Sequence, residues 1–596
     1  MHERALLDVL KKHLPESWEI YERPYLNGDF PDMVLLHPRI GFQIINLVLW
    51  EEGEVHIDST DTHSDRTLTY VRARADLKEV VANPITRLRS HRNNILNNYI
   101  PELGESVDKN TALLKLLTLA LYFPLMKTDE ARMLVQDRYI VVFGSDGIQE
   151  HHSFRHIVPN ITFTPRTDLT LPPDWADKAR AWLAPSIHHK EMNDPLPLNK
   201  EQRRYATNAD NARRQRIRGV SGSGKSLIVA QRAANLAEQG KQVLIMTYNV
   251  TLCNYLLALT ERTQNNFERT LLEFRHFHGF CSSVIHAADR IWPQLSSDDE
   301  QTKSDMFDTL IPAMLIQIAQ KDATRRRYGA ILIDEGQDFI QAWFDALLPF
   351  LAEDGQILLV ADENQNIYER AVRWTDHKMI GGDFGKWAEL KVSYRVPPAI
   401  LNKMIQFLKT FMPDFERTGL IPIPPEMSQT KFGWNPHHVW KEVRSYAETA
   451  YALLMAVQWL QKQGRTLDTM VILVTTNGEG TALVEHFQHA HIPVNHIFKA
   501  DEHEWNSVKT QNKRNFYVGD PRLKICTYHS FKGWEANNIF VVVSEKHVDH
   551  SLLYVALTRT TENLFVLNRN PVYQEYGSRW PRDWDGTDIF DDSTTG

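Results

Sequence analysis

Short runs of branched apolar residues recur along the chain, separated by longer segments in which apolar positions follow helical spacing. Between Leu198 and about Leu567 these runs include residues 242–247, 330–333, 356–360, 470–474 and 539–543. Short apolar runs that alternate with helices are typical of parallel sheets covered by helices. The pattern therefore predicts an α/β fold for this region.

The N-terminal third has a more mixed pattern. Residues 1 to about 185 combine helical segments with strand-like runs at Pro31–Trp50 and Tyr139–Phe143. The most apolar stretch, Leu113–Met126, is too short to span a bilayer, and we expect a buried helix there. Prolines in Asn193–Pro197 break any helix and indicate a linker. We expect domains at residues 1–185, 186–392 and 393–572, followed by a disordered acidic tail at 573–596.

Composition narrows the classes of function. The chain has 596 residues, 42% of them hydrophobic, and a net charge of −8, as expected for a soluble globular protein of several domains. The negative net charge excludes a globally basic protein that coats nucleic acid, but it allows a local basic groove. No signal peptide or membrane span is visible. Widely spaced cysteines suit the reducing cytoplasm, where we expect the protein: Cys253, Cys281 and Cys526.

The run at residues 219–226 fits G-x-x-x-x-G-K-[ST], the phosphate-binding loop of P-loop proteins. Its glycines allow backbone N–H groups to turn toward phosphate oxygens: Gly219, Gly222 and Gly224. Lys225 would reach the β- and γ-phosphates, and the Ser226 hydroxyl would hold Mg²⁺. The loop predicts a site for a nucleoside triphosphate with Mg²⁺.

A P-loop site needs a second group for the metal, and the residues after the apolar run 331–333 supply it. Asp334 would hold Mg²⁺ together with Ser226. Glu335 is placed to orient and deprotonate the attacking water. The two carboxylates predict hydrolysis of the triphosphate.

The order of these and other short motifs across residues 198–567 resembles a UvrD/Rep-type superfamily 1 helicase. The similar segments are 198–202, 244–249, 276–280, 334–338, 359–368, 393–395, 527–535 and 554–559, in addition to the phosphate loop. The resemblance implies two RecA-like P-loop domains and movement 3′→5′ on single-stranded DNA or a junction, driven by ATP. Short spacings between motifs imply reduced accessory subdomains, so we expect translocation rather than efficient unwinding by this chain alone.

The resemblance also implies roles for individual residues. Gln202 would read the adenine edge, Glu535 would contact the ribose, and Gln365 would sense the γ-phosphate. Arg395 and Arg559 would reach the γ-phosphate from the second RecA-like domain. The residues expected to contact the nucleic-acid strand are Thr247, Tyr248, Asn249, His278, Tyr368, Thr527 and His529. The stacking aromatic usual after Tyr368 is missing, so base stacking would fall to Tyr368, Tyr248 or Trp374.

Residues 29–48 resemble a nuclease-related (NERD) domain with a PD-(D/E)xK-like core. Glu3 and Asp32 fit its first two acidic positions, whereas Asn46 stands in place of the metal-binding glutamate and Val48 in place of the lysine. Such nucleases need two carboxylates for the metal that activates water. We therefore expect a degenerate domain that binds nucleic acid or a partner without cutting.

Two alternatives remain open. The chain could be an ATP-gated switch that binds nucleic acid or a partner without productive unwinding. It could instead be an active nuclease–helicase fusion, if Glu51 or Glu52 supplies the missing carboxylate. A separate protein partner, such as a nuclease, would suit a role in DNA repair or antiphage defence.

Overall fold

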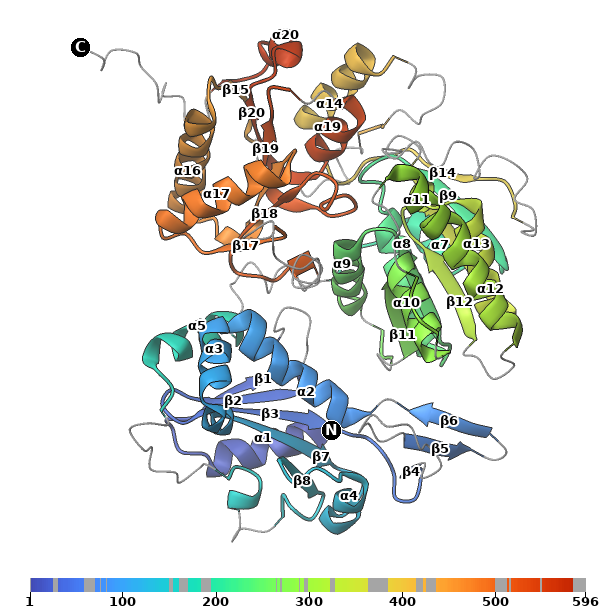
Figure 1. Cartoon of the computed structure of the whole chain (residues 1–596), viewed down its shortest axis with the longest axis vertical. Coiled ribbons are helices and arrows are strands. Elements are labelled where there is room, and N and C mark those ends of the chain that lie inside the picture. Colours follow the sequence, from blue (N-terminus) through green and yellow to red (C-terminus); the bar gives the residue numbers. More distant parts are fainter. Residues whose placement is uncertain are drawn as a thin grey trace. The chain divides into compact units, whose positions relative to one another are not determined.

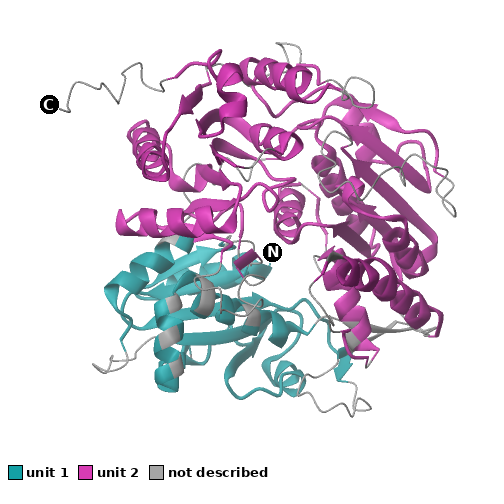
Figure 2. Cartoon of the chain, turned by 45° about the horizontal axis from the view of Figure 1, so that its top comes forward, with its two compact units in different colours: residues 1–192 teal, residues 193–596 magenta. Residues whose placement is uncertain are grey.

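A computed structural model gives the arrangement of most of the chain. The described residues are 2–24, 31–57, 70–74, 77–81, 83–149, 154–159, 170–183, 195–263, 265–267, 271–288, 290–293, 299–321, 327–362, 384–413, 422–424, 436–498, 512–513, 516–546 and 549–582. The chain divides into two compact units, residues 1–192 and 193–596 (Figure 2). Each unit has its own hydrophobic core.

A five-stranded sheet in the order β1-β2-β3-β7-β8 forms the centre of the N-terminal unit. Its strands are β1 (Glu19–Glu22), β2 (Met33–His37), β3 (Gly41–Leu47), β7 (Leu117–Phe123) and β8 (Ile140–Gly144). The first three strands are antiparallel, while β7 and β8 run parallel to β3. A second, antiparallel sheet contains β4 (Val55–Ile57), β5 (Tyr70–Arg74) and β6 (Leu77–Val81).

Helices cover both faces of the five-stranded sheet (Figure 1). Met33 and Leu35 share a core with the leucines of α1 (His2–His13). Val34 and Leu36 belong to the opposite core, because successive side chains of a strand point to opposite faces. That core includes residues of α2 (Pro84–Asn94), α3 (Pro101–Lys109) and α5 (Pro173–Leu183). The short helix α4 (Thr128–Leu134) precedes β8. The strand-like runs predicted from the sequence are confirmed as β2, β3 and β8.

The segment Leu113–Met126 is not the buried helix that its apolar composition suggests, so this prediction was wrong. After a 3₁₀ helix at Thr111–Leu116, the chain forms strand β7 between β3 and β8. A central parallel strand buries both faces and reads as a continuous apolar run, which periodicity cannot distinguish from a buried helix. Backbone pairing with the two neighbouring strands decides the outcome.

The second unit contains two six-stranded parallel sheets, and we call the part around each sheet a lobe. The first lobe has the order β11-β10-β12-β13-β9-β14. Its strands are β9 (Arg214–Gly219), β10 (Val243–Thr247), β11 (Leu272–His276), β12 (Tyr328–Ile333), β13 (Leu351–Ala361) and β14 (Ala388–Leu390). Its helices are α7 (Lys200–Ala206), α8 (Lys225–Glu238), α9 (Val250–Glu261), α10 (Phe277–Ala287), α11 (Glu300–Ser304), α12 (Ile311–Lys321) and α13 (Gln341–Leu347).

The second lobe has the order β15-β20-β19-β16-β18-β17. Its strands are β15 (His438–Glu442), β16 (Met470–Val474), β17 (Val494–His496), β18 (Leu523–Thr527), β19 (Ala536–Val543) and β20 (Thr560–Asn568). Its helices are α14 (Pro398–Phe411), α16 (Tyr446–Lys462), α17 (Asn477–His489), α19 (His550–Leu557) and α20 (Gln574–Gly577). Neighbouring strands in both sheets run parallel, which confirms the predicted α/β class.

The start of the expected disordered tail is ordered, which corrects the prediction for residues 573–582. Tyr573, Tyr576 and Trp580 are buried and pack around Trp440 and Phe407 of the second lobe. Three aromatic side chains within eight residues provide enough apolar surface to anchor this segment. Residues 583–596 lie outside the described part of the chain.

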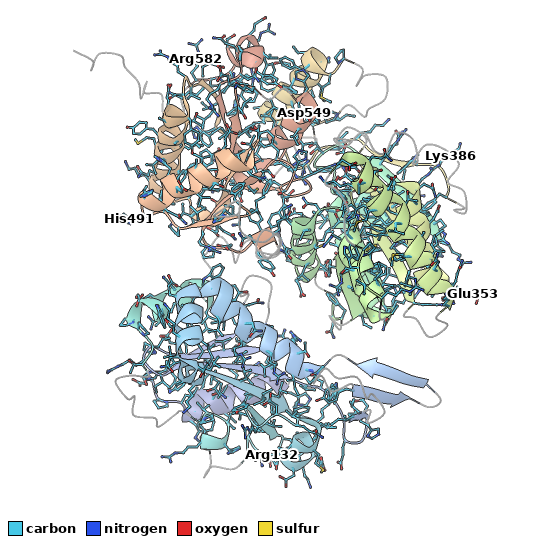
Figure 3. All side chains as sticks on the ribbon, in the orientation of Figure 1. Arg132, Glu353, Lys386, His491, Asp549 and Arg582 are labelled. Carbon is cyan, nitrogen blue, oxygen red and sulfur yellow. The ribbon has the colours of Figure 1, made fainter. Side chains whose placement is uncertain are left out.

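Strand order in the first lobe positions the candidate site. Strand β13 lies between β9, which leads into the phosphate loop, and β12, which leads to Asp334. Because the strands are parallel, their carboxyl ends meet at one edge of the sheet, where α/β proteins bind ligands. Side chains such as Arg132, Glu353 and Lys386 lie on the outside of the ribbon (Figure 3). Within the described residues, no helix is both long and apolar enough to cross a membrane.

Candidate active site

The phosphate loop connects β9 to α8 and depends on two glycines. Gly222 and Gly224 have φ angles of 76° and 86°, a region that other residues adopt only with strain. A Cβ atom on Gly224 would lie 2.4 Å from Nε2 of Gln202, and one on Gly222 would lie 2.6 Å from Cβ of Arg395. The loop is therefore packed tightly on both sides.

Lys225 begins helix α8, and its ammonium group lies inside the loop. It donates to the carbonyl oxygens of Gly219 (2.8 Å) and Val220 (2.9 Å), and its Nζ lies 3.1 Å from Oδ2 of Asp362. The side chains of Lys225 and Asp362 are 8% and 1% exposed. This buried cation lies at the N-terminus of α8, where the helix dipole also favours an anion.

Ser226 and Asp334 form the group predicted to hold Mg²⁺. The Ser226 hydroxyl donates to Oδ2 of Asp334 at 2.7 Å, which brings the two sites predicted from distant parts of the sequence together. Burial raises the pKa of Asp334, and the neighbouring carboxylate of Glu335 raises it further. A hydroxyl and a buried carboxylate at a phosphate loop are a donor set that fits Mg²⁺.

Glu335 follows Asp334 in a strained backbone conformation. Its φ of 53° is left-handed, at a cost of about 1–3 kcal/mol for a residue other than glycine. Gln337 donates to the Glu335 carboxylate. Burial would raise the pKa of Glu335, but the positive charges of Lys532, Lys225 and Arg559 outweigh it and lower that pKa. Glu335 is therefore held as a carboxylate, the form that a general base requires.

Gln202 packs behind the phosphate loop. It closes a capping box at the start of α7, since its side chain accepts from the N–H of Asn199, and its Nε2 donates to the carbonyl of Ser223 at 2.9 Å. Its contact with the loop is thus fixed by hydrogen bonds at both ends of the amide. The predicted contact with adenine stays a prediction.

Arg395, in the segment between β14 and α14, forms an ion pair with Glu535, which directly precedes β19 of the second lobe. Nε of Arg395 lies 2.5 Å from Oε2 of Glu535, and its Nη1 lies 3.4 Å from the Ser221 hydroxyl in the phosphate loop. Burial would raise the pKa of Glu535, but the positive charge of Arg395 outweighs this effect and lowers that pKa. A residue predicted to bind phosphate and one predicted to bind ribose therefore lie in contact with each other beside the loop.

Arg559 is buried, with only 1% of the residue exposed. Its guanidinium donates to the carbonyl of Val555 at 2.9 Å. Burial lowers the pKa of Arg559 to about 10, Arg395 acts in the same direction, and Glu335 and Asp362 of the first lobe oppose the shift. Arg559 stays charged at neutral pH, within the electric field of the groups around the phosphate loop.

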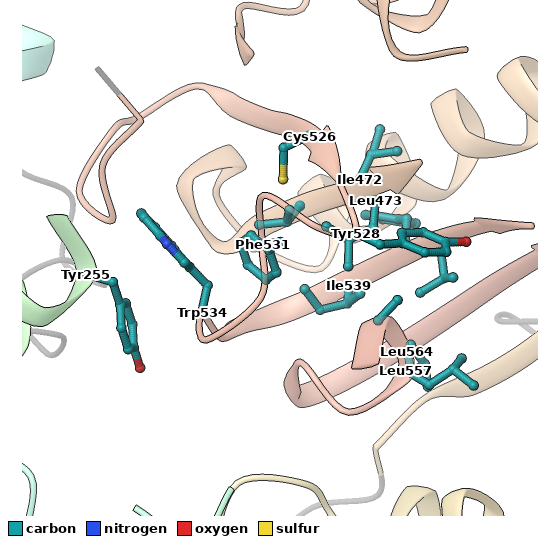
Figure 4. Close-up of a cluster of buried hydrophobic side chains, with 14 of the residues drawn as sticks. Tyr255, Ile472, Leu473, Cys526, Tyr528, Phe531, Trp534, Ile539, Leu557 and Leu564 are labelled. Carbon is teal, nitrogen blue, oxygen red and sulfur yellow. The ribbon is translucent and has the colours of Figure 1, made fainter. Parts of the chain in front are cut away.

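Three contacts that the sequence did not predict bind the lobes together. The first is a buried ion pair, in which Lys532 lies 2.7 and 2.8 Å from the two carboxylate oxygens of Asp338. The second involves Asn249, which caps α9 and donates to the carbonyls of residues 529, 530 and 532 at 3.0–3.3 Å. Tyr255 of α9 also faces Trp534, with ring centroids 5.4 Å apart (Figure 4).

The residues predicted to contact a strand fall into two groups. Tyr248 stacks on Trp343 at 5.8 Å, and His278 meets the same ring edge-on at 4.9 Å, at the carboxyl end of the first sheet. The buried hydroxyl of Thr247 has no hydrogen-bond partner among the described residues. By contrast, Asn249 contacts the second lobe directly, because its amide donates to the carbonyl of His529. Thr527 ends β18 at the start of the same turn, where its hydroxyl donates to that of Ser530. Gln365, Tyr368 and Trp374 lie outside the described residues.

Four residues at the candidate site were not assigned a role from the sequence: Asp338, Asp362, Gln337 and Lys532. Asp362 had a usable signal, since it follows the predicted strand at 356–360 as Asp334 follows its own strand. The Lys532–Asp338 pair had none, because its members are 194 positions apart.

In the N-terminal unit, Asp32 and Asn46 are neighbours, but they bind each other and the backbone. Asp32 accepts from the N–H of Leu47 at 2.8 Å, and its own N–H donates to the Asn46 side chain at 3.4 Å. Glu3 forms an ion pair with Arg23. Val48 is buried and donates its N–H to the carbonyl of Tyr122.

Glu51 and Glu52, the alternative metal ligands, are exposed on the turn before β4. No group of three or more His, Cys, Asp or Glu residues in the described part of the chain is arranged to hold a metal ion.

Comparison with known proteins agrees with the geometry of the first lobe. Residues 202–371 match a family described as an AAA domain, a range that contains the phosphate loop, β12 and β13. The chain is also 23% identical over 415 residues to a protein of Acanthamoeba polyphaga mimivirus named "Putative ATP-dependent DNA helicase". That similarity covers 64% of this chain and 55% of the viral protein, so the chain matches about half the length of this relative.

Proposed function

We propose that this chain is an ATP-hydrolysing motor of the UvrD-like superfamily 1 type, moving 3′→5′ on single-stranded DNA. The observation that carries the proposal is that charged groups of both lobes act on one phosphate loop. Lys225 lies inside the loop, Arg395 reaches the Ser221 hydroxyl at 3.4 Å, and Arg559 of the second lobe interacts electrostatically with Glu335 of the first. The similarity to a protein named as a DNA helicase supports DNA as the track. A role in DNA repair or antiphage defence belongs to the same proposal.

In this mechanism, the chain positions ATP and supplies charge. Lys225 and the loop N–H groups bind the phosphates, and Ser226 with Asp334 would hold Mg²⁺, which neutralises charge on the phosphate oxygens. Glu335 accepts a proton from the attacking water. Arg395 and Arg559 stabilise the negative charge that develops on the transferred group.

Coupling to a strand follows from the contacts between the lobes. The cap of α9 in the first lobe holds the turn at residues 529–532 of the second. The residues predicted to contact DNA, Tyr248, His278 and Thr527, lie at or next to the carboxyl ends of β10, β11 and β18. A change in the spacing of the lobes on ATP binding would move these surfaces relative to each other, as translocation requires.

The N-terminal unit serves in this proposal as a platform for nucleic acid or a partner protein, such as a separate nuclease. Asp32 is already bound to backbone at the start of β2, and its neighbour at the expected metal position is a neutral amide. Two carboxylates around a metal are needed to activate water. The pair Asp32–Asn46 provides only one carboxylate.

ATPase rates with no nucleic acid, single-stranded DNA, RNA and duplex test the proposal. Single-stranded DNA should stimulate the wild type most. Lys225→Ala should abolish the activity, and Glu335→Gln should lower kcat by about 10²–10⁴, the range for a lost general base. Displacement of streptavidin from a 3′- or 5′-biotinylated strand then reads the direction.

Failure of every nucleic acid to stimulate the ATPase would contradict the motor and favour an ATP-gated binding switch. Release of streptavidin from the 3′ end alone would contradict 3′→5′ movement, because a motor moving that way displaces the block at the 5′ end.

A further inference from the structure

The carboxylate at the end of β13, Asp362, has no role in the chemistry proposed above. It is nonetheless one of three acceptors around the ammonium of Lys225, with the carbonyls of Gly219 and Val220. An ammonium group has three N–H donors. In this arrangement all three have partners within the protein.

A phosphate oxygen can therefore bind Lys225 only if one of these partners gives way. The two carbonyls belong to the phosphate loop and are neutral. Asp362 is the one negatively charged partner of the three, and its side chain is 1% exposed. Exchange of the Asp362 carboxylate for a phosphate would keep the buried Lys225 paired with an anion throughout, which avoids the cost of an isolated buried charge.

Asp362 is also connected to the predicted general base. Its backbone N–H donates to Oε1 of Gln337 at 2.9 Å, and Nε2 of Gln337 donates to the Glu335 carboxylate. The two bonds fix the orientation of the amide, because only its oxygen can accept from an N–H and only its nitrogen can donate to a carboxylate. One side chain thus joins the residue that holds Lys225 to Glu335.

We propose that Asp362 is a positioning residue, an internal counter-ion that holds Lys225 in the nucleotide-free site and is displaced by the phosphates of the nucleotide. This inference rests on the nucleotide site of the proposed function and adds the group that phosphate must displace. Asp362 then competes with phosphate for Lys225. It weakens nucleotide binding and favours release of the product by recapturing Lys225.

The test is a fluorescence titration of the full chain with a fluorescent ADP analogue and Mg²⁺. Asp362→Asn should bind about tenfold more tightly or better, because a neutral amide competes less for Lys225 and close buried charge pairs are worth at least this factor. Asp354→Asn changes an exposed aspartate on the same strand and should bind as the wild type does. A merely structural role for Asp362 predicts weaker binding, not tighter.

Equal or weaker binding by Asp362→Asn, with a wild type that binds and a Lys225→Ala variant that does not, would overturn the inference alone. A wild type that fails to bind, or binds as well after Lys225→Ala, would overturn the proposed function together with it.

Thermal unfolding without nucleotide gives a second test, and this test does not require the single variant Asp362→Asn to fold. Lys225→Ala removes the ammonium group beside the buried Asp362 carboxylate and should lower Tm. Adding Asp362→Asn to Lys225→Ala should raise Tm again. A double variant that unfolds at the same temperature as Lys225→Ala, or below it, would overturn the inference.

Discussion

Replacing Lys532 by alanine should strongly destabilise the second unit. Lys532 lies 2.7 Å from Asp338, with side chains 3% and 2% exposed, so its loss leaves a buried carboxylate without its cation. Removing one partner of a buried ion pair costs about 3–5 kcal/mol. At about 2–4 °C per kcal/mol for domains of 150–250 residues, Tm should fall by about 6–20 °C.

The stability lost in Lys532→Ala should also depend on pH. Burial raises the pKa of Asp338 to about 6, and the carboxylates of Glu335 and Asp362 act in the same direction, while Lys532 opposes them. The folded-state pKa therefore lies above the unfolded value of about 3.9. For such a carboxyl, stability is fully present below the unfolded pKa and falls as pH rises through the folded pKa. Without Lys532 the pKa rises further, so the deficit should be larger at pH 8.5 than at pH 6.

Scanning calorimetry of the full chain at the two pH values measures this effect. Arg579→Ala, which removes an exposed pair with Glu575, is the matched control and should change Tm little, because surface pairs contribute about 0–1 kcal/mol. Asp338→Leu combined with Lys532→Met should recover most of the stability, since no charge is left buried. A Lys532→Ala protein whose Tm equals that of the wild type at both pH values would refute this reasoning.

Three further variants test other contacts. Asn249→Ala should cost about 1–3 kcal/mol by calorimetry, because it removes a helix cap and the amide that bonds to the second lobe; an unchanged Tm would count against this contact. Gly533→Ala should be destabilising by about 1–3 kcal/mol, since its φ is +87° and a Cβ would lie 2.7 Å from Leu252. Gly478→Ala, at an open position, is its control, and equal losses would contradict the packing argument. Asp32→Ala should destabilise the N-terminal unit without changing DNA cleavage; Mg²⁺-dependent cutting by the wild type that disappears in this variant would contradict the platform role.

The parts of the fold that the sequence predicts are those with local determinants. The phosphate loop is a contiguous run, and its glycines are required by the backbone angles at Gly222 and Gly224. Five strands of the two parallel sheets form at the short apolar runs that the pattern predicted: β10, β12, β13, β16 and β19. Ser226 and Asp334 were correctly expected to meet, because each follows a strand of the same parallel sheet.

The errors and omissions depend on contacts between distant residues. Strand β7 has the composition of a buried helix, and only pairing with β3 and β8 makes it a strand. The segment 573–582 is anchored by Trp440 and Phe407, which are far away in the sequence. The Lys532–Asp338 pair, separated by 194 positions, follows from no local pattern, whereas the strand before Asp362 gave a signal for Lys225–Asp362 that was not used.

The central claim is that two lobes form one site for ATP hydrolysis, and Arg559 tests it most directly. It belongs to the second lobe, yet the charges of Glu335 and Asp362 in the first act on it. The measurement is kcat of the DNA-stimulated ATPase of Arg559→Ala, with nucleotide binding measured in parallel. An arginine that stabilises the transferred phosphoryl group contributes about 10³–10⁵ in kcat, so a loss of this size with binding retained is the expected result. An Arg559→Ala protein that hydrolyses ATP at the wild-type rate would contradict the two-lobe site.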